Sequence, residues 1–239
     1  MRDVTQNAIQ KTKVAIIGAG FGGLAMSIRL LQSQIKDFVI LEKTNDVGGT
    51  WRENQYPGAA CDVQSHMYSL SFAPKTDWSK RYAEADEIFE YIQDITEQYK
   101  LKDYCKFNHE VSHAEFDENR NVWTLEFKDQ PTIEAQFVIF ASGPLHVPQI
   151  PHLKGIEKFK GKVFHSSQWD HQYSLEGKAV ASIGTGGSAI QYIPEIAQEV
   201  KQLYVFQRTA AWVIPRDERK YSQLSKSLFK ASNIYRQIH

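Results

Sequence analysis

A glycine-rich turn near the start of the chain constrains the fold more than any other stretch. Residues 14–17 are apolar, a Gly-x-Gly-x-x-Gly pattern follows, and a helical pattern runs over residues 24–31. In this order the first glycine permits a tight turn, the second lets the backbone approach a pyrophosphate, and the third lets the helix pack on the strand. The helix N-terminus then faces the phosphates. An acid follows the last glycine by 19 residues, so the sequence predicts a dinucleotide site formed by Gly18, Gly20, Gly23 and Glu42.

The residues around this turn predict one βαβ unit. Strands are expected over 13–17 and 37–41, with a helix over 24–32 between them. Two strands connected in this way are expected to be parallel neighbours. Residues 1–12 are expected to be a disordered or loosely docked lead-in.

The stretch from residue 48 to residue 72 shows no helix or strand period. A structureless stretch of this length inside a compact domain is usually functional. It also carries aromatic side chains that would be costly to leave in water, at positions 51, 56, 68 and 72. We interpret it as a functional loop, and an ordinary surface loop is the alternative.

The middle of the chain predicts a helix followed by an antiparallel meander. The apolar spacing indicates an amphipathic helix over 84–99. Strands are expected over 106–116, 122–128 and 132–135, and these would form the meander.

The apolar run 137–141 is typical of a strand that is buried on both faces. Prolines follow it at positions 144, 148 and 151. Because proline clusters punctuate folds, the sequence predicts two domains, one over 1–150 and the start of a second over 151–239.

The strand–turn–helix–strand pattern occurs a second time after this boundary. Strands are expected over 178–183 and 202–207, and the helix between them reaches about residue 198 with Pro194 inside it. A fixed offset of 166 residues aligns the first glycines, Gly18 and Gly184, and pairs Glu42 with Arg208. The sequence therefore predicts an α/β fold with two Rossmann-like units, the first with an inserted antiparallel β-meander and the second truncated.

The replacement of Glu42 by Arg208 in the repeat predicts two different nucleotides. A carboxylate at the end of the second strand accepts hydrogen bonds from a ribose diol and repels a 2′-phosphate, whereas an arginine pairs with the phosphate. We therefore expect an unphosphorylated adenine dinucleotide in the first unit and NADP(H) in the second. That combination suggests FAD with NADPH. A surface arginine at a strand end is the alternative for Arg208.

Charge and composition argue against several other classes of protein. The chain has 28 Lys and Arg against 28 Asp and Glu, which argues against a general binder of nucleic acid or anionic membranes. The first residues lack the apolar stretch of a signal peptide, and no apolar run approaches the ~20 residues that span a bilayer. Cys61 and Cys105 lack the spacing of a metal site, so we expect a reduced, cytoplasmic protein without a metal.

A motif between the two glycine turns resembles the fingerprint F-x-G-x-x-x-H-x-x-x-W-(P/D) of the Baeyer–Villiger monooxygenases. It starts at Phe159, and its histidine and tryptophan are His165 and Trp169. Within the class B flavoprotein monooxygenases, Trp169 favours the Baeyer–Villiger branch over the N- and S-oxygenating relatives.

Other segments are similar to further motifs of the same family. Segments 48–51, 56–63 and 140–143 resemble its flavin-side motifs, and 205–209 resembles its NADP strand. The resemblance covers about residues 10–216, in order.

The resemblance implies cofactor-binding roles by position. On the FAD side these are Gly18, Gly20, Gly23 and Glu42 for the adenosine and pyrophosphate, Thr50, Trp51, Asp62 and Tyr68 towards the flavin ring, and the backbone of Val111 at the adenine. On the NADP side they are Thr185, Gly186, Gly187, Ser188, Arg208 and Thr209. The resemblance also implies catalytic roles for two residues. Asp62 would tune a catalytic arginine, and His165 would couple domain motion to cofactor binding, with a linker histidine bonded to backbone as the alternative.

The resemblance implies that NADPH reduces FAD, that the reduced flavin activates O₂, and that a ketone substrate becomes an ester or lactone. The catalytic arginine of the family lies further along than this sequence reaches. We therefore expect the chain to correspond to the N-terminal half of such an enzyme, with a missing C-terminal half or a partner chain. An N- or S-oxygenating flavin monooxygenase and a non-catalytic FAD/NADP-binding module are the alternatives.

Overall fold

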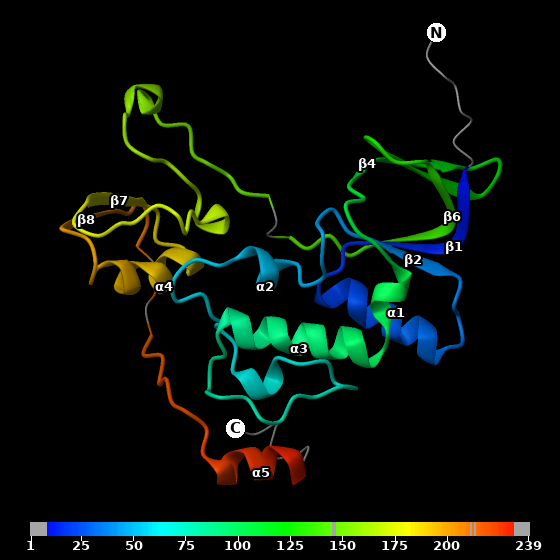
Figure 1. Cartoon of the computed structure of the whole chain (residues 1–239), viewed down its shortest axis with the longest axis horizontal. Coiled ribbons are helices and arrows are strands. Elements are labelled where there is room, and N and C mark those ends of the chain that lie inside the picture. The colour runs from blue at the N-terminus through cyan, green and yellow to red at the C-terminus, as the bar shows by residue number, and fades with distance from the viewer. Residues whose placement is uncertain (1–8, 145–146, 211, 213, 232–239) are drawn as a thin grey trace. The chain divides into compact units, whose positions relative to one another are not determined.

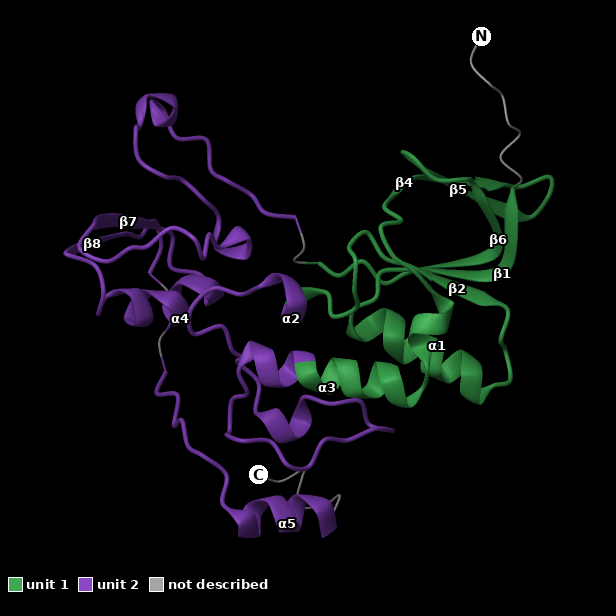
Figure 2. Ribbon diagram, viewed as in Figure 1, with its two compact units in different colours: residues 1–50, 90–146 green, residues 51–89, 147–239 purple. Residues whose placement is uncertain are grey.

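The computed structural model describes residues 9–144, 147–210, 212 and 214–231. The chain divides into two compact units, coloured separately in Figure 2. Unit 1 comprises residues 1–50 and 90–146, and unit 2 comprises residues 51–89 and 147–239.

Unit 1 is built on a six-stranded sheet with the strand order β3-β2-β1-β6-β5-β4 (Figure 1). The first four of these strands are parallel, and β5 and β4 continue the sheet in antiparallel fashion. The predicted α/β fold with an antiparallel meander is therefore confirmed. The strands are β1 (Gln10–Ile17), β2 (Phe38–Leu41), β3 (Cys105–Lys106), β4 (Val111–Asp117), β5 (Val122–Phe127) and β6 (Ile133–Phe140).

The first βαβ unit forms as its sequence predicts. Strand β1 leads through the glycine turn into α1 (Phe21–Gln32), and β2 then pairs parallel to β1, from Val14 opposite Phe38 to Ile17 opposite Leu41. The lead-in prediction is wrong for residues 10–12, because they pair with residues 133–135 of β6. Backbone ladder bonds hold these polar residues in the sheet whatever their side chains. Residues 1–8 lie outside the described part of the chain.

Strand β6 is one continuous strand where the sequence predicts two. Its first residues, 133–135, pair antiparallel with β5, and the whole strand pairs parallel with β1. A strand has two hydrogen-bonding edges, so one strand joins the meander to the parallel part of the sheet. The predicted break between 132–135 and 137–141 is therefore wrong.

The two faces of this sheet bury alternating residues of the same strands. Ala15 and Val39 belong to a buried cluster on one face, together with Leu125 of the meander. Ile16 points to the other face, towards α1, whose Leu24 and Ile28 are completely buried. Alternate residues of β1 are thus buried on opposite faces of the sheet, as is usual for parallel strands.

The apolar end of β6 differs from this pattern. Phe137 and Phe140 are 58% and 61% exposed, so the prediction that run 137–141 is buried on both faces is wrong. Within the described residues, only part of this run is covered. Trp123 of β5 packs edge-on against Phe140, with ring centroids 6.0 Å apart.

Unit 2 contains the second strand–turn–helix–strand pattern. Strand β7 (Ala179–Ile183) leads through the second glycine turn into α4 (Gly187–Ile196), and β8 (Gln202–Phe206) pairs parallel to β7. Ile183, Tyr204 and Phe206 are each more than half exposed. The other helices are α2 (Thr50–Glu53), α3 (Ala85–Gln98), α5 (Gln223–Ala231) and the 3₁₀ turns η1 (Ser65–Met67), η2 (Leu101–Tyr104), η3 (Ile156–Lys158) and η4 (Ser166–Gln168), of which η2 and most of α3 belong to unit 1.

Helix α5 is held by ring contacts of Phe229 with His66 and Tyr221. Phe229 is 1% exposed and stacks on His66 with ring centroids 5.3 Å apart. The backbone of Tyr221 bonds to Ser79, which adds a β-like contact. The helix buries Phe229 and leaves Leu224 71% exposed. Among the described residues, the helices are too short or too polar to cross a membrane.

We predict that Gly23→Ala lowers the free energy of unfolding by about 1–3 kcal/mol, because a Cβ at residue 23 would overlap the carbonyl oxygen of Gly18. Thermal unfolding followed by circular dichroism measures the change. Gly22→Ala is the matched control, because its Cβ would meet Ala141 at an ordinary 3.8 Å and alanine favours the helix. Equal midpoints for the two variants would contradict this packing argument.

Candidate functional site

The first glycine turn in unit 1 combines positive backbone angles with close backbone contacts. Gly18 has φ +105°, and a Cβ there would meet the carbonyl oxygen of Ala141 at 2.6 Å. Gly20 is the N-cap of α1, and no side chain among the described residues caps it. The first-turn N–H groups of a helix lack intrahelical acceptors, so this N-terminus suits a pyrophosphate.

A second pair of glycines closes on the same turn. Gly48 donates its N–H to the carbonyl oxygen of Ala19 over 3.0 Å. A Cβ at Gly49 would lie 3.1 Å from the Cα of Gly20, and Gly49 itself has φ +54°. The flavin-side motif therefore begins in direct backbone contact with the glycine turn. Thr50 follows at the end of unit 1 and is exposed.

The carboxylate of Glu42 is buried and faces the same turn. It is 5% exposed, accepts the Ala19 N–H over 2.8 Å at one oxygen, and accepts the Thr44 N–H over 2.9 Å at the other. The Thr44 hydroxyl adds a third bond of 2.8 Å. A carboxylate has about four acceptor sites. The group therefore stays fixed beside the loop and retains capacity for a ribose hydroxyl.

Val111 lies close to this acid in unit 1. The N–H of His109 donates to the carbonyl oxygen of Glu42, and the N–H of Asn108 donates to that of Thr44, both over 2.8 Å. Val111 begins β4 two residues further on. The structure thus brings together the predicted adenosine-side residues Gly18, Gly20, Gly23, Glu42 and Val111 in one unit.

The second glycine turn in unit 2 repeats the backbone of the first. Gly184 has φ +99°, and Gly186 is the N-cap of α4 with φ −77° and ψ −174°, close to the −85° and −169° of Gly20. A Cβ at Gly186 would meet no described heavy atom within 4 Å, so this turn is open. Thr185, Gly187 and Ser188 complete the turn and the first residues of α4.

From the end of its first strand to the end of its second, the repeat in unit 2 is one residue shorter than the first unit. Ile17 pairs with Leu41 in unit 1, and Ile183 pairs with Phe206 in unit 2. The residue after the paired strand is therefore Glu42 in the first case and Gln207 in the second. The alignment of Glu42 with Arg208 is wrong by one position, because a one-residue shortening leaves no mark in a fixed offset. Arg208 and Thr209 follow Gln207 and are exposed.

Two of the predicted flavin-ring residues, Trp51 and Tyr68, meet in unit 2. The indole N–H of Trp51 donates to the Tyr68 hydroxyl over 3.1 Å, and their rings meet edge to face at 5.5 Å. Burial raises the pKa of the Tyr68 hydroxyl, and the charge of Asp62 raises that pKa further. Asp62 is itself exposed. Trp51 and Tyr68 are thus fixed by each other, and the Asp62 carboxylate lies near enough to act on them electrostatically.

A glutamine from α4 holds the loop that carries the flavin-side motif, and sequence reasoning missed it. The Oε1 atom of Gln191 accepts from the Tyr56 hydroxyl over 2.9 Å and from the Ala60 N–H over 3.2 Å. Its Nε2 atom donates to the Ala60 carbonyl oxygen over 2.8 Å. A Cβ at Gly58 would meet the Gln191 carbonyl oxygen at 2.9 Å. No local sequence signal links residues this far apart.

The fingerprint residues form an aromatic cluster with α4. Trp169 lies 5.3 Å from the Tyr192 ring and 5.2 Å from the Phe164 ring, centroid to centroid. His165 caps η4, where its Nδ1 atom accepts the Ser167 N–H over 3.2 Å. This bond requires the tautomer that carries its proton on Nε2.

The two cysteines are protonated thiols at neutral pH. Burial raises the pKa of Cys61 to about 11 and that of Cys105 to about 12. Within the described parts of the chain, no group of three or more His, Cys, Asp or Glu is placed to hold a metal ion.

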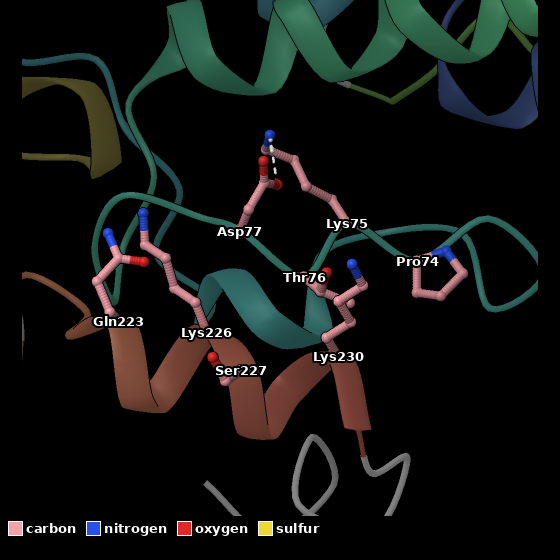
Figure 3. Close-up of a pocket in the computed structure, with 8 residues that line it drawn as sticks. All are labelled: Pro74, Lys75, Thr76, Asp77, Gln223, Lys226, Ser227 and Lys230. Carbon is pink, nitrogen blue, oxygen red and sulfur yellow. Dashed lines mark ion pairs between the residues drawn. The ribbon is translucent and has the colours of Figure 1, made fainter.

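A shallow hollow of about 390 Å³ in unit 2 lies away from these residues, between loop 74–77 and α5 (Figure 3). On the loop side of the hollow, Lys75 forms an ion pair with Asp77 over 2.9 Å. On the helix side, Lys226 and Lys230 line the hollow. None of the predicted site residues lines it.

The sequence pattern of the FMO-like family, described as flavin-binding monooxygenase-like, matches residues 11–227. The chain belongs to this family. It is 45% identical to a Baeyer–Villiger monooxygenase of Streptomyces coelicolor over 93% of this chain and 43% of that protein. It is 46% identical to one of Pseudomonas aeruginosa over 95% of this chain and 43% of that protein.

Solved structures of family members superpose on most of the chain. An oxidized steroid monooxygenase bound to NADP matches with a TM-score of 0.86 and 35% identity, over 95% of this chain and 44% of that one. A cyclohexanone monooxygenase from Rhodococcus sp. Phi1 bound to NADP⁺ matches with a TM-score of 0.87 and 33% identity, over 94% of this chain and 43% of that one. The chain spans less than half the length of these relatives.

We predict that Gln191→Ala speeds amide hydrogen exchange at Ala60 by about tenfold, because the N–H and carbonyl of Ala60 lose their partner. Exchange measured by NMR on residues 56–61 tests this. Gln198→Ala is the matched control, since Gln198 is exposed, follows the end of α4, and bonds through its side chain to the carbonyl oxygen of Pro194 in that helix. Unchanged exchange at Ala60 in the Gln191 variant would show that the loop is held by other contacts.

Proposed function

We propose that the protein is an FAD- and NADPH-dependent monooxygenase that inserts one oxygen atom of O₂ next to a ketone carbonyl, giving an ester or lactone. The observation that carries this proposal is the duplicated strand–turn–helix–strand pattern with different groups at the end of its second strand. One copy ends in the buried acid Glu42, and the other ends in Gln207 and Arg208. One chain thus offers two dinucleotide sites of different ribose chemistry.

FAD fits the turn in unit 1. Gly18 and Gly23 leave backbone where side chains would clash, Gly20 begins the helix, and Glu42 keeps a carboxylate beside the turn for the ribose diol. The backbone at Val111 lies on the adenine side. Thr50, Trp51, Asp62 and Tyr68 serve the flavin ring.

NADP(H) fits the turn in unit 2. The open glycine turn offers the N-terminus of α4 to the pyrophosphate. Thr185, Gly186, Gly187 and Ser188 surround that end, and Arg208 and Thr209 bind the 2′-phosphate. An arginine fork recognises a phosphate bidentately.

The two cofactors together supply reducing equivalents and an activated form of O₂ when bound. The chain's own residues position and shield that chemistry. Trp51 and Tyr68 hold one another, and Gln191 holds the loop that leads to Asp62. Asp62 contributes a negative charge that orients a cationic group at the reacting centre.

His165 is a positioning residue in this proposal. Its Nδ1 atom fixes the turn at Ser167, and the next aromatic residue, Trp169, packs on α4 beside the NADP turn. A movement of the linker is thereby passed to the helix that binds NADP. This agrees with a histidine that bonds to backbone and acts through the linker.

The Baeyer–Villiger reaction is favoured over N- or S-oxygenation by Trp169 in the fingerprint. The relatives that share 45% and 46% identity are Baeyer–Villiger monooxygenases. We further propose an FAD-binding domain over 1–150, an NADP-binding domain that starts at about 151, and a cytoplasmic location.

A product assay tests the function. The protein, supplied with FAD, NADPH and O₂, is expected to convert a cyclic ketone to the lactone with one NADPH consumed per product. Mass spectrometry with ¹⁸O₂ should place one labelled oxygen in the ring. A sulfoxide formed from a thioether with no lactone from any cyclic ketone would favour the S-oxygenating alternative and overturn the proposal.

A further inference from the structure

We infer that Gln207 is a specificity-determining residue of the second nucleotide site. It places a neutral amide where the first site places a carboxylate, and this lets a 2′-phosphate approach. The inference rests on the proposed binding of NADP(H) in unit 2.

The backbone assigns Gln207 to the place of Glu42. In unit 1 the N–H of Gly18 donates to the carbonyl oxygen of Leu41 over 2.8 Å, and Glu42 is the next residue. In unit 2 the N–H of Gly184 donates to the carbonyl oxygen of Phe206 over 2.9 Å, and Gln207 is the next residue. The strand registers agree with these bonds.

The side chains reach the same position of the turn. Glu42 accepts the N–H of Ala19, the residue after the first glycine, over 2.8 Å. Gln207 donates its Nε2 to the hydroxyl of Thr185, again the residue after the first glycine, over 2.8 Å. Both side chains therefore lie across the mouth of their turns, where the ribose of a dinucleotide is bound.

The chemistry of the two groups differs in charge and in donors. An ionised carboxylate only accepts hydrogen bonds, so it suits two ribose hydroxyls and repels a 2′-phosphate. An amide keeps one acceptor for a hydroxyl and a second N–H for a phosphate oxygen. Gln207 thus removes repulsion, whereas Arg208, one residue on, adds attraction.

Gln207→Glu tests this assignment, because the carboxylate can still accept a hydrogen bond from the Thr185 hydroxyl while one negative charge is added. We expect the Kd for NADP⁺ to rise about tenfold or more, with the Kd for NAD⁺ unchanged or lowered. Isothermal titration calorimetry on the purified protein measures both constants without catalysis. Arg208→Ala is the comparison variant and should also weaken NADP⁺ selectively.

Gln202→Glu is the matched control. It adds the same charge to the same strand at its first residue, about 13 Å from Phe206 at the usual rise per residue. At that distance salt screens the charge, so the NADP⁺ to NAD⁺ ratio should not change.

The outcomes separate the inference from the function on which it rests. A wild-type protein that prefers NADP⁺, with Gln207→Glu no different from Gln202→Glu, overturns the role of Gln207 and leaves the function standing. A wild-type protein that binds neither nucleotide, or binds them equally, overturns the proposed NADP site and the inference together.

Discussion

The contact between the start of α1 and the end of β1 is the constraint on which unit 1 depends. The carbonyl of Gly18 occupies the space where a side chain at Gly23 would lie, and the carbonyl of Ala141 restricts Gly18 in the same way. Three backbone segments therefore converge on one turn, and neither Gly18 nor Gly23 has room for a Cβ there. Because backbone fills this corner, the N-terminus of α1 and the carboxylate of Glu42 face the same point. The cofactor site is thus a consequence of how strand and helix pack.

The second unit uses the same backbone device with different electrostatics. The angles of Gly184 and Gly186 reproduce those of Gly18 and Gly20, so the geometry that receives a pyrophosphate is repeated. What differs is the side chain that lies across the turn. One copy has a buried carboxylate that accepts three hydrogen bonds. The other copy has an exposed amide at this place, followed by an arginine. We propose that this change of charge, together with the arginine, separates two nucleotides that differ by one phosphate.

The sequence predicts those features of the fold and site that arise from local patterns. The Gly-x-Gly-x-x-Gly spacing, the apolar runs and the meander fixed the topology of unit 1 and located Glu42. Features that depend on contacts between residues far apart in the chain could not be predicted from the sequence. Pairing on both edges made β6 one strand, and the exposure of Phe140 depends on what covers the sheet. The clamp formed by Gln191 joins residues far apart in the chain, and a one-residue shortening displaced Gln207 from its expected alignment.

We propose that the turn at Gly18–Gly23, with Glu42, binds the adenosine diphosphate part of FAD. The most direct measurement is a titration of the flavin-free protein with FAD and with FMN, followed by flavin fluorescence. FMN has the same ring system but lacks the adenosine that Glu42 and Val111 face. The account predicts that FAD binds at least about a hundredfold more tightly than FMN, which corresponds to the loss of several hydrogen bonds. Equal affinity for the two flavins would contradict it.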